Sequence, residues 1–385
     1  MDFHAFMYGV VGRRHELEQG MAGKNPALFQ RMLDEIGAYA RLCDDAGYAG
    51  IGLPEHHLQI EGFEAAQEPG LLGLYIGMQT KKLRFDQFGY VLPTHNPLRV
   101  AEHAATLDHL LGGRLNVAFV RGYQSRWFQN FAVVPGVKAV GAWNQRTQED
   151  QVNHELFEEC VDIILTAWRS DTFAYKGKYW TYPIETQLPY DHPAYYTYGQ
   201  GVDRDGTVRE IGIAPRPLQQ PIPLYGGFTN SLRTVMYWAR VGGKPIIMSD
   251  NMEFCELCWS TYRDEAERVG RKVRHGDEAA WGGYLVLADS NSEAEAWAED
   301  CLWYWKTWYG PYGRGLPPML VGDADTICRK LDEVSRHVKS NEIFLQFGQG
   351  ILDRDKCLKT LELFAEKVMP RFSLLANALI FAISV

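Results

Sequence analysis

Eight short β-type runs alternate along the chain with longer helical patterns, and this alternation restricts the possible folds more than any other feature. The runs are short and mostly apolar, and the segments between them repeat apolar residues at helical spacing. The strand candidates are residues 3–10, 48–54, 83–92, 114–122, 221–227, 245–249, 282–288 and 341–348. Strands that alternate with helices predict parallel βαβ units.

Start and stop signals support two of the helices, and apolar spacing alone supports a third. Residues 26–46 carry apolar side chains at helical spacing, begin with a proline and are followed by Gly47. Pro97 opens a second helix that stops at the glycine pair 112–113. Residues 154–168 repeat the same apolar spacing and predict a third helix.

Closing these units into one α/β barrel is the economical arrangement for 385 residues. A doubly wound open sheet is the main alternative, but no GxGxxG follows the first strand, so the dinucleotide fingerprint is missing. Residues 171–220 break the alternation with a Tyr-, Pro- and Gly-rich run. We therefore predict a (β/α)8 TIM barrel with an insertion at about 171–220, one domain over 1–372, and an apolar tail over 373–385.

Composition narrows the possible partners and location. The net charge of −9 gives no reason to expect nucleic acid or an anionic membrane surface. The apolar tail is shorter than the ~20 residues of a bilayer span, so it predicts a docked helix or an oligomer contact.

Seven cysteines and no secretory signal indicate a reducing compartment, hence the cytoplasm. Cys255 and Cys258 form a CxxC without a second pair, which does not predict a metal site.

The carboxyl ends of the predicted strands carry the polar residues, and in a barrel the active site lies at these ends. After the fifth strand comes a helix start rich in side-chain donors, which suits a phosphate group, and an arginine ends the fourth strand. Each could instead be a helix cap or the partner of a core carboxylate. The candidates are Arg121, Thr229, Asn230 and Ser231.

Glu55, His56 and His57 follow the second strand. Joint metal binding would need further ligands, yet no HExxH or other spaced partner is present, and adjacent strand residues point to opposite faces. One histidine aimed into the barrel mouth would suit proton handling near neutral pH. A structural histidine is the other alternative.

Several stretches together resemble the bacterial luciferase-like monooxygenase family of flavin-dependent enzymes. They occur in the family's order and cover about residues 1–372. These stretches are "GYAGIGLPEHH", "YVLPTHNPLRVAEHAATLDHLLGGRLNVAFVRG", "FAYKGKYWTYP", "APRPLQQPIPLYGG", "LVGDADTICRKLDEV" and "LFAEKVMPRF".

The resemblance implies a barrel that binds reduced FMN at the strand ends and oxygenates an organic substrate with O2 through a C4a-hydroperoxyflavin. It implies a two-component system in which a separate flavin reductase supplies the reduced FMN, and a homodimer. Within the family pattern, His56 would face the reactive edge of the flavin and act in catalysis. The implied cofactor-binding residues are Phe88, Gly89, Val120, Arg121, Gly122, Thr229, Asn230 and Ser231, with a non-proline cis peptide at Phe88–Gly89.

This sequence also departs from luciferase. Val120 stands where luciferase has a reactive cysteine. The family position that supplies a second phosphate-binding arginine falls near His154, and Arg146 is a possible substitute for that arginine. Aromatic residues at 179–198 and 303–312 could line a pocket for an aromatic or polycyclic substrate, or form a dimer face. Two other functions stay open: hydride transfer with a deazaflavin, and a non-catalytic flavin-binding subunit.

Overall fold

Eight parallel strands close into a barrel in a computed structural model, which describes residues 1–141, 143–190, 192–229 and 231–372. The ring runs β1-β2-β3-β4-β7-β8-β9-β11 and closes where β11 pairs with β1. All eight predicted strands are present, so the predicted (β/α)8 barrel is confirmed. They are β1 (Asp2–Phe6), β2 (Gly50–Leu53), β3 (Arg84–Val91), β4 (Leu115–Val120), β7 (Leu224–Thr229), β8 (Lys244–Ile247), β9 (Ala280–Leu287) and β11 (Glu342–Phe347).

One further parallel strand, β10 (Met319–Gly322), was not predicted. It pairs with the end of β9, where Met319 lies opposite Tyr284. Because β11 occupies one edge of β9 and β8 pairs only with its first residues, β10 extends the edge that β8 leaves open. Its length alone does not explain the omission, since β2 and β8 also have four residues, but β10 directly follows Pro317 and Pro318, which are typical of a loop.

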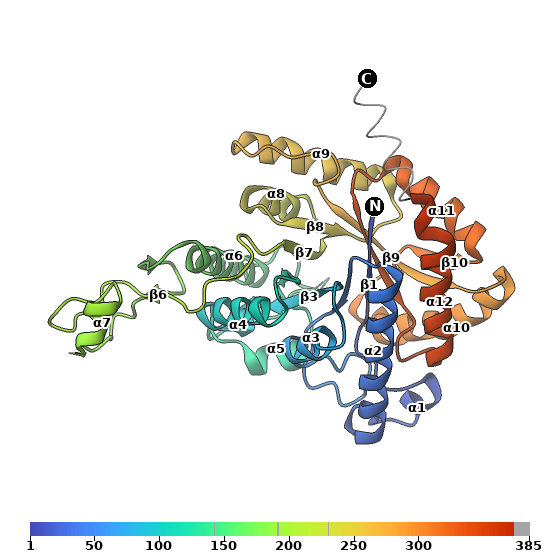
Figure 1. The fold of residues 1–385 in the computed structure, drawn as a ribbon, viewed down its shortest axis with the longest axis horizontal. Coiled ribbons are helices and arrows are strands. Elements are labelled where there is room, and N and C mark those ends of the chain that lie inside the picture. The colour runs from blue at the N-terminus through green and yellow to red at the C-terminus, as the bar shows by residue number, and fades with distance from the viewer. Residues whose placement is uncertain (142, 191, 230, 373–385) are drawn as a thin grey trace. The chain divides into compact units, whose positions relative to one another are not determined.

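Helices follow the strands around the ring (Figure 1). The main ones are α2 (Pro26–Ala46), α3 (Pro69–Gly77), α4 (Pro97–Leu110), α6 (Gln148–Arg169), α8 (Leu232–Val241), α9 (Met252–Arg268), α11 (Ala324–His337) and α12 (Arg354–Leu363). Shorter or additional elements are α1 (Arg14–Glu18), η1 (Ala22–Lys24), η2 (Leu92–Thr94), α5 (Ser125–Phe131), α7 (Pro193–Tyr198), α10 (Asn291–Trp308), η3 (Gly310–Tyr312) and the π-helical η4 (Phe364–Val368).

Local chemistry explains the helix ends. The Asn25 side chain accepts hydrogen bonds from the N–H groups of Ala27 and Leu28 at the start of α2, and Gly47 ends the helix at φ +83°. The helix expected from residue 154 begins six residues earlier in α6, where the Thr147 side chain caps it. The first turn of that helix is polar, so the apolar spacing in the sequence does not extend to the start of the helix.

The chain divides into two compact units. The first comprises residues 1–89, 114–118 and the chain from 223 onward, and it holds the barrel strands apart from the last two residues of β3 and of β4. Within it, α2 packs beside α12 and α8 beside α9 (Figure 1). No helix in the described ranges is both long and apolar enough to span a membrane.

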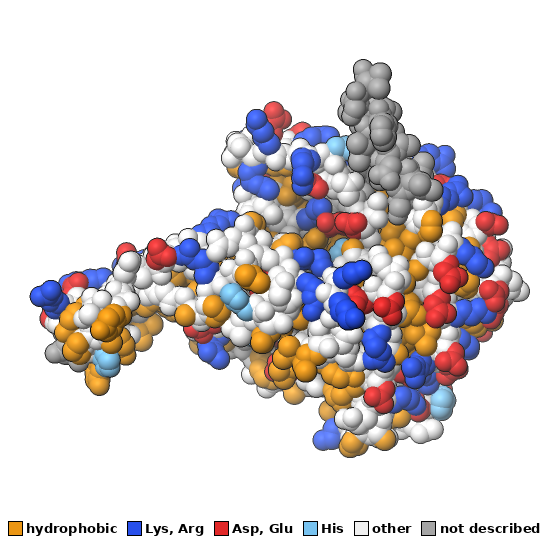
Figure 2. All heavy atoms as spheres, viewed as in Figure 1, with side chains coloured by type: hydrophobic (Ala, Val, Ile, Leu, Met, Phe, Trp, Pro, Cys, Tyr) orange, Lys and Arg blue, Asp and Glu red, His pale blue; other side chains and the backbone are white. Residues whose placement is uncertain are grey.

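The second unit comprises residues 90–113 and 119–222. Helix α4 packs against α6, and the Trp168 indole N–H donates to the carbonyl oxygen of Ala101 at 3.0 Å. The predicted insertion lies between α6 and β7 and contains a short hairpin, β5 (Tyr175–Lys176) with β6 (Thr181–Tyr182), followed by α7. Hydrophobic side chains gather at the α7 end of this insertion (Figure 2).

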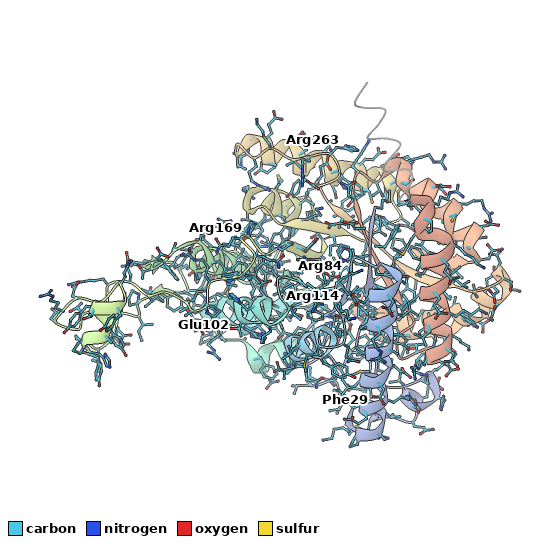
Figure 3. The ribbon with its side chains drawn as sticks, viewed as in Figure 1. Phe29, Arg84, Glu102, Arg114, Arg169 and Arg263 are labelled. Carbon is cyan, nitrogen blue, oxygen red and sulfur yellow. The ribbon has the colours of Figure 1, made fainter. Side chains whose placement is uncertain are left out.

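Two arginines tie the amino-terminal ends of β3 and β4 to their surroundings in the first unit (Figure 3). Arg84 donates to the side-chain oxygen of Asn116 and to the carbonyl of Leu115, both at 2.8 Å. Arg114 donates to the Thr80 hydroxyl and to the carbonyl of Leu83. These bonds satisfy backbone carbonyls at the end of the barrel opposite the strand ends that carry the candidate site.

Candidate active site

The two histidines after β2 contact different carboxylates. His57 Nε2 lies 2.8 Å from Glu55 Oε1, whereas His56 Nε2 lies 3.3 Å from Glu64 Oε1. Both histidines lie in the irregular segment that follows β2, and their side chains reach different partners. The described residues contain no group of three or more His, Cys, Asp or Glu side chains arranged to hold a metal ion.

Glu64 is fully buried and is the carboxylate around which this part of the site is built. Its Oε2 accepts a 2.7 Å hydrogen bond from the Trp308 indole N–H, and its Oε1 accepts one from the Tyr309 hydroxyl. Buried carboxylates are rare unless paired, so these donors and His56 account for its position. The sequence analysis missed Glu64, because nothing in the loop around it shows that the end of α10 lies against it.

Burial governs the electrostatics of His56. Removal from water lowers the pKa of the His56 imidazole below its ordinary value, while the Glu64 carboxylate acts in the opposite direction and Arg314 lowers it further. Burial, together with the charge of Glu64, raises the pKa of the Tyr8 hydroxyl well above its ordinary value. The neutral imidazole is therefore the dominant form of His56 near neutral pH.

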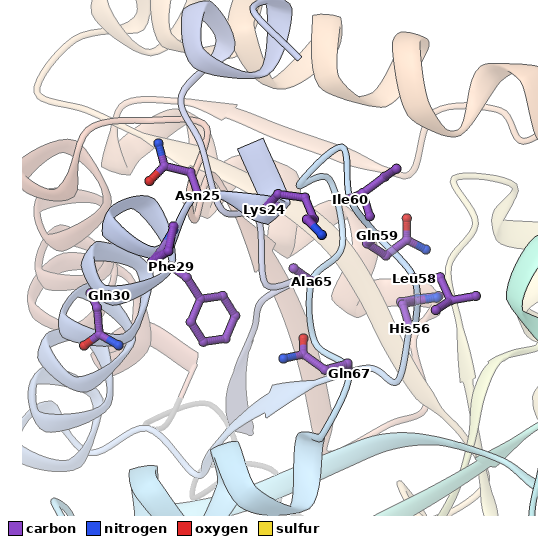
Figure 4. A pocket seen from close by; sticks show the side chains of 12 residues that line it. Lys24, Asn25, Phe29, Gln30, His56, Leu58, Gln59, Ile60, Ala65 and Gln67 are labelled. Atoms are coloured by element: carbon purple, nitrogen blue, oxygen red, sulfur yellow. The ribbon is translucent and has the colours of Figure 1, made fainter. Parts of the chain in front are cut away.

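His56 also borders a cavity of about 370 Å³ between its loop and the start of α2 (Figure 4). The Phe29 ring projects into this cavity, and Leu58 and Ile60 add apolar surface. Lys24 is the cation among its lining residues, which include no Asp or Glu. A volume in this range suits a small organic molecule.

Phe88 and Gly89, both predicted to bind the cofactor, lie near the carboxyl end of β3. The Phe88 ring points into the barrel, with centroids 5.8 Å from Phe6 and 4.8 Å from Phe344. Within the described residues every cis peptide bond precedes a proline, so the cis bond expected at Phe88–Gly89 is wrong. A non-proline cis bond costs about 3–4 kcal/mol, and Gly89 turns the backbone at φ +146° without one.

Gln346 is a second residue that the sequence analysis missed. It lies two positions after Phe344 on β11, so its side chain points into the same barrel interior, and it is 1% exposed. Its Nε2 donates to Met248 Sδ at 3.2 Å, and among the described residues its Oε1 has no hydrogen-bond partner. A buried acceptor of this kind fits a ligand with an N–H group.

At the end of β7, the predicted phosphate residues serve partly in local structure. The Ser231 hydroxyl accepts from the N–H of Thr234 and so caps α8. Thr229 is buried, and its hydroxyl lies 3.4 Å from the carbonyl oxygen of Gly226. Asn230 lies outside the described residues. The first turn of a helix is where backbone N–H groups can bind an anion.

Val120, Arg121 and Gly122 belong to the second unit. Arg121 Nη1 donates to Asp150 Oδ1 at 2.8 Å, and this contact helps to hold the pKa of Asp150 below its ordinary value. The alternative pairing of Arg121 with a carboxylate is therefore present. Gly122, at φ +80°, leaves room for Val91 and Phe128, which a Cβ atom would approach within 2.7 Å.

The suggested substitute arginine contacts the same carboxylate. Arg146 has φ +62°, and its backbone N–H donates to Asp150 Oδ2 at 2.9 Å. His154 is buried on α6, with Nε2 2.7 Å from Glu158 Oε1. Asp150 therefore gathers donors from residues 121 and 146, and both arginines stay predicted phosphate contacts.

Comparison with known proteins places this chain in a family. The model of the family described as luciferase-like monooxygenase matches residues 1–324. The oxygenase component of flavin-dependent trigonelline monooxygenase from Acinetobacter baylyi is 28% identical over 160 residues, which is 42% of this chain and 40% of that protein.

Solved structures share the fold over nearly the whole chain. A monooxygenase of Streptomyces bottropensis superposes with a TM-score of 0.72 at 20% identity, covering 97% of this chain and 100% of that one. The oxygenating constituent of 3,6-diketocamphane monooxygenase from Pseudomonas putida, in complex with FMN, gives 0.68 at 17%, covering 96% and 98%. An F420-dependent secondary alcohol dehydrogenase gives 0.62 at 14%, covering 96% and 98%.

The family match covers more than half of the chain, and it agrees with the closed barrel and with a candidate site at the carboxyl ends of its strands. The chain therefore belongs to the luciferase-like monooxygenase family of oxidoreductases.

Proposed function

We propose that the protein is the oxygenase of a two-component monooxygenase, which uses reduced FMN from a separate flavin reductase and O2 to oxygenate a small organic substrate. The observation that carries the proposal is the buried His56 at the end of β2, beside Glu64 and bordering a cavity. Family membership and the two flavin- or FMN-linked relatives support it.

The residues inside the barrel fit a flavin. The Phe88 and Phe6 rings stack on each other inside the barrel, both of them buried, and Gly89 follows Phe88 without a side chain. The buried acceptor of Gln346 could accept a hydrogen bond from a ring N–H. When bound, the reduced flavin supplies the electrons that activate O2. We propose that Phe88, Gly89, Thr229, Asn230 and Ser231 hold the cofactor, and we retain Val120, Arg121 and Gly122 as cofactor-binding residues.

His56 is the proposed catalytic residue, and its task is to hold or move a proton near the reacting atoms. A neutral imidazole close to neutral pH can both accept and donate a proton, as general acid–base catalysis requires. The cavity beside His56 is the proposed substrate site, because Phe29, Leu58 and Ile60 suit an organic ring. Two relatives are named as monooxygenases for trigonelline and 3,6-diketocamphane, and these compounds are the trial substrates.

We also propose that the protein forms a homodimer and is located in the cytoplasm. The insertion exposes large apolar side chains, and such patches mark interaction surfaces. All seven cysteines are free and buried, as expected for a reducing compartment.

The test compares His56→Ala with His57→Ala, using trigonelline and diketocamphane as trial substrates, and measures product formed per reduced FMN oxidised. We expect His56→Ala to bind FMN almost normally and to lose ~10²–10⁴-fold in oxygenation rate, with O2 released as peroxide. His57→Ala should affect thermal stability more than catalysis, because its ring pairs with Glu55 instead.

Three outcomes would contradict the proposal. Uncoupling in His57→Ala and not in His56→Ala would place the wrong histidine in the site. Hydride transfer to or from a deazaflavin without O2 uptake would identify the other oxidoreductase chemistry of this fold. Flavin binding without any turnover of substrate or O2 would identify a non-catalytic subunit.

A further inference from the structure

We propose that Glu64 is a positioning residue that orients His56 with its Nε2–H toward the carboxylate and thereby places the titrating lone pair of the ring on Nδ1. The inference rests on the proposed function of His56 as the catalytic residue. It is drawn from the 3.3 Å contact between His56 Nε2 and Glu64 Oε1 and from the complete burial of Glu64.

The chemistry of the two groups determines which of them carries the hydrogen at this contact. An ionised carboxylate only accepts, so the nitrogen that faces it must carry the hydrogen. A neutral imidazole has one N–H, and if Nε2 holds it, Nδ1 is the basic nitrogen. A buried carboxylate selects a histidine tautomer by the same logic in other general acid–base sites.

Glu64 is itself held in place by the end of α10. The Trp308 indole and the Tyr309 hydroxyl donate to its two oxygens. The neighbouring Phe63 ring stacks on Trp308 with centroids 5.0 Å apart and planes 10° apart, and the Tyr304 hydroxyl donates to the carbonyl of Phe63 at 3.0 Å. Both the carboxylate and its backbone are thus fixed by one aromatic segment.

This arrangement gives a role to the aromatic residues at 303–312. The sequence analysis had two alternatives for them, a substrate pocket or a dimer face. Tyr304, Trp305 and Tyr309 are buried, and they pack against Tyr8 after β1. Their contacts therefore support the loop that carries Glu64.

Several charged or titratable groups act on His56, and the test must separate them. Glu64 and Glu55 stabilise its protonated form, while Arg314 and His57 disfavour it, and Glu64 has the largest effect of the four. Lys24 lines the same cavity as His56. Glu55 offers a matched control, because it is also a buried glutamate that contacts a histidine, at 2.8 Å from His57.

The first experiment follows the ¹⁵N resonances of the His56 ring against pH in the full-length protein without flavin. Glu64→Gln should lower the pKa of His56, since a stabilising negative charge is lost, and should shift the neutral ring away from the Nε2–H tautomer, because an amide can donate as well as accept. Glu55→Gln should move the His56 resonances less. An equal or larger effect of Glu55→Gln would overturn the proposal.

A second set of variants applies if Glu64→Gln does not fold. Trp308→Phe and Tyr309→Phe each remove one donor to Glu64 and should alter the His56 tautomer ratio, whereas Thr307→Ala changes an exposed side chain of the same helix and should not. An unchanged ratio in both donor variants would show that Glu64 does not orient the ring.

The last measurement connects orientation to chemistry. Glu64→Gln should reduce product formed per reduced FMN by about tenfold, which is a part of the ~10²–10⁴-fold that a positioned acid–base group contributes, with the affinity for FMN little changed. A changed tautomer with full coupling would confirm the contact and refute its catalytic role. An uncoupled His56→Ala beside a fully coupled Glu64→Gln would overturn this inference and leave the proposed function intact.

Discussion

The buried amide of Gln346 should lower the stability of the flavin-free protein and contribute to FMN binding. Its buried Oε1 has no hydrogen-bond partner among the described residues, and leaving a buried acceptor unsatisfied costs about 1–3 kcal/mol. We predict that Gln346→Leu raises the melting temperature of the flavin-free protein, because it removes this penalty. It should also weaken FMN binding by about five- to tenfold, the worth of one lost hydrogen bond.

Flavin fluorescence and thermal melts measure the two effects in the same samples. Gln346→Glu is the matched comparison, because it keeps the size and the acceptor but adds a charge that burial disfavours. A melting temperature that rises while FMN affinity stays unchanged would mean that the amide is a tolerated defect of the barrel interior and contacts no ligand.

The sequence could predict the contacts of a residue where its partners lie close along the chain, but not where they lie far along it. The sequence predicted that adjacent histidines after a strand would face different directions, which is a local property, and His56 and His57 do contact different carboxylates. Glu64 meets Trp308, 244 positions away, and no local pattern carries that information. The peptide bond between Phe88 and Gly89 was wrongly expected to be cis, whereas it is trans.

At the scale of elements, β7 and α8 depend on a glycine at their contact. A Cβ atom at Gly226 would lie 1.9 Å from the indole nitrogen of Trp238, which is fully buried on α8. We predict that Gly226→Ala lowers stability by about 1–3 kcal/mol, the usual cost of overpacking, because the indole must move within a closed core. Chemical denaturation followed by tryptophan fluorescence measures the change.

Gly310 provides the control for this substitution. A Cβ atom there would meet nothing within 4 Å, so Gly310→Ala should leave the denaturation midpoint unchanged. Equal stabilities for Gly226→Ala and wild type would show that α8 can shift along β7 without loss of packing.

The elements that the sequence predicted share one property. All eight barrel strands and helices such as α2 have a repeated apolar pattern or clear end signals, such as Asn25–Pro26 and Gly47. The sequence analysis predicted neither β10, which directly follows two prolines, nor α7, which has end signals at Pro193 and Gly199 but buries none of its side chains. Their positions depend on contacts that form only after the barrel closes.

At the scale of the whole molecule, the insertion offers the surface that a partner copy would cover. Three large side chains there are strongly exposed: Leu188 at 78%, Tyr190 at 65% and Tyr198 at 89%. Figure 2 shows hydrophobic side chains gathered around α7, which is more than the scattered single residues normal for a monomer surface. The proposed homodimer gives these residues a burial site.

Sedimentation velocity tests this directly. We predict that the wild-type protein sediments as a dimer and that Leu188→Ser with Tyr198→Ser converts it to a monomer, because the apolar area that favours association is lost. Met78→Ser, which alters an equally exposed side chain at the end of α3, should leave the dimer intact. A dimer that survives the double substitution would move the interface away from the insertion, and a monomeric wild-type protein would refute the dimer itself.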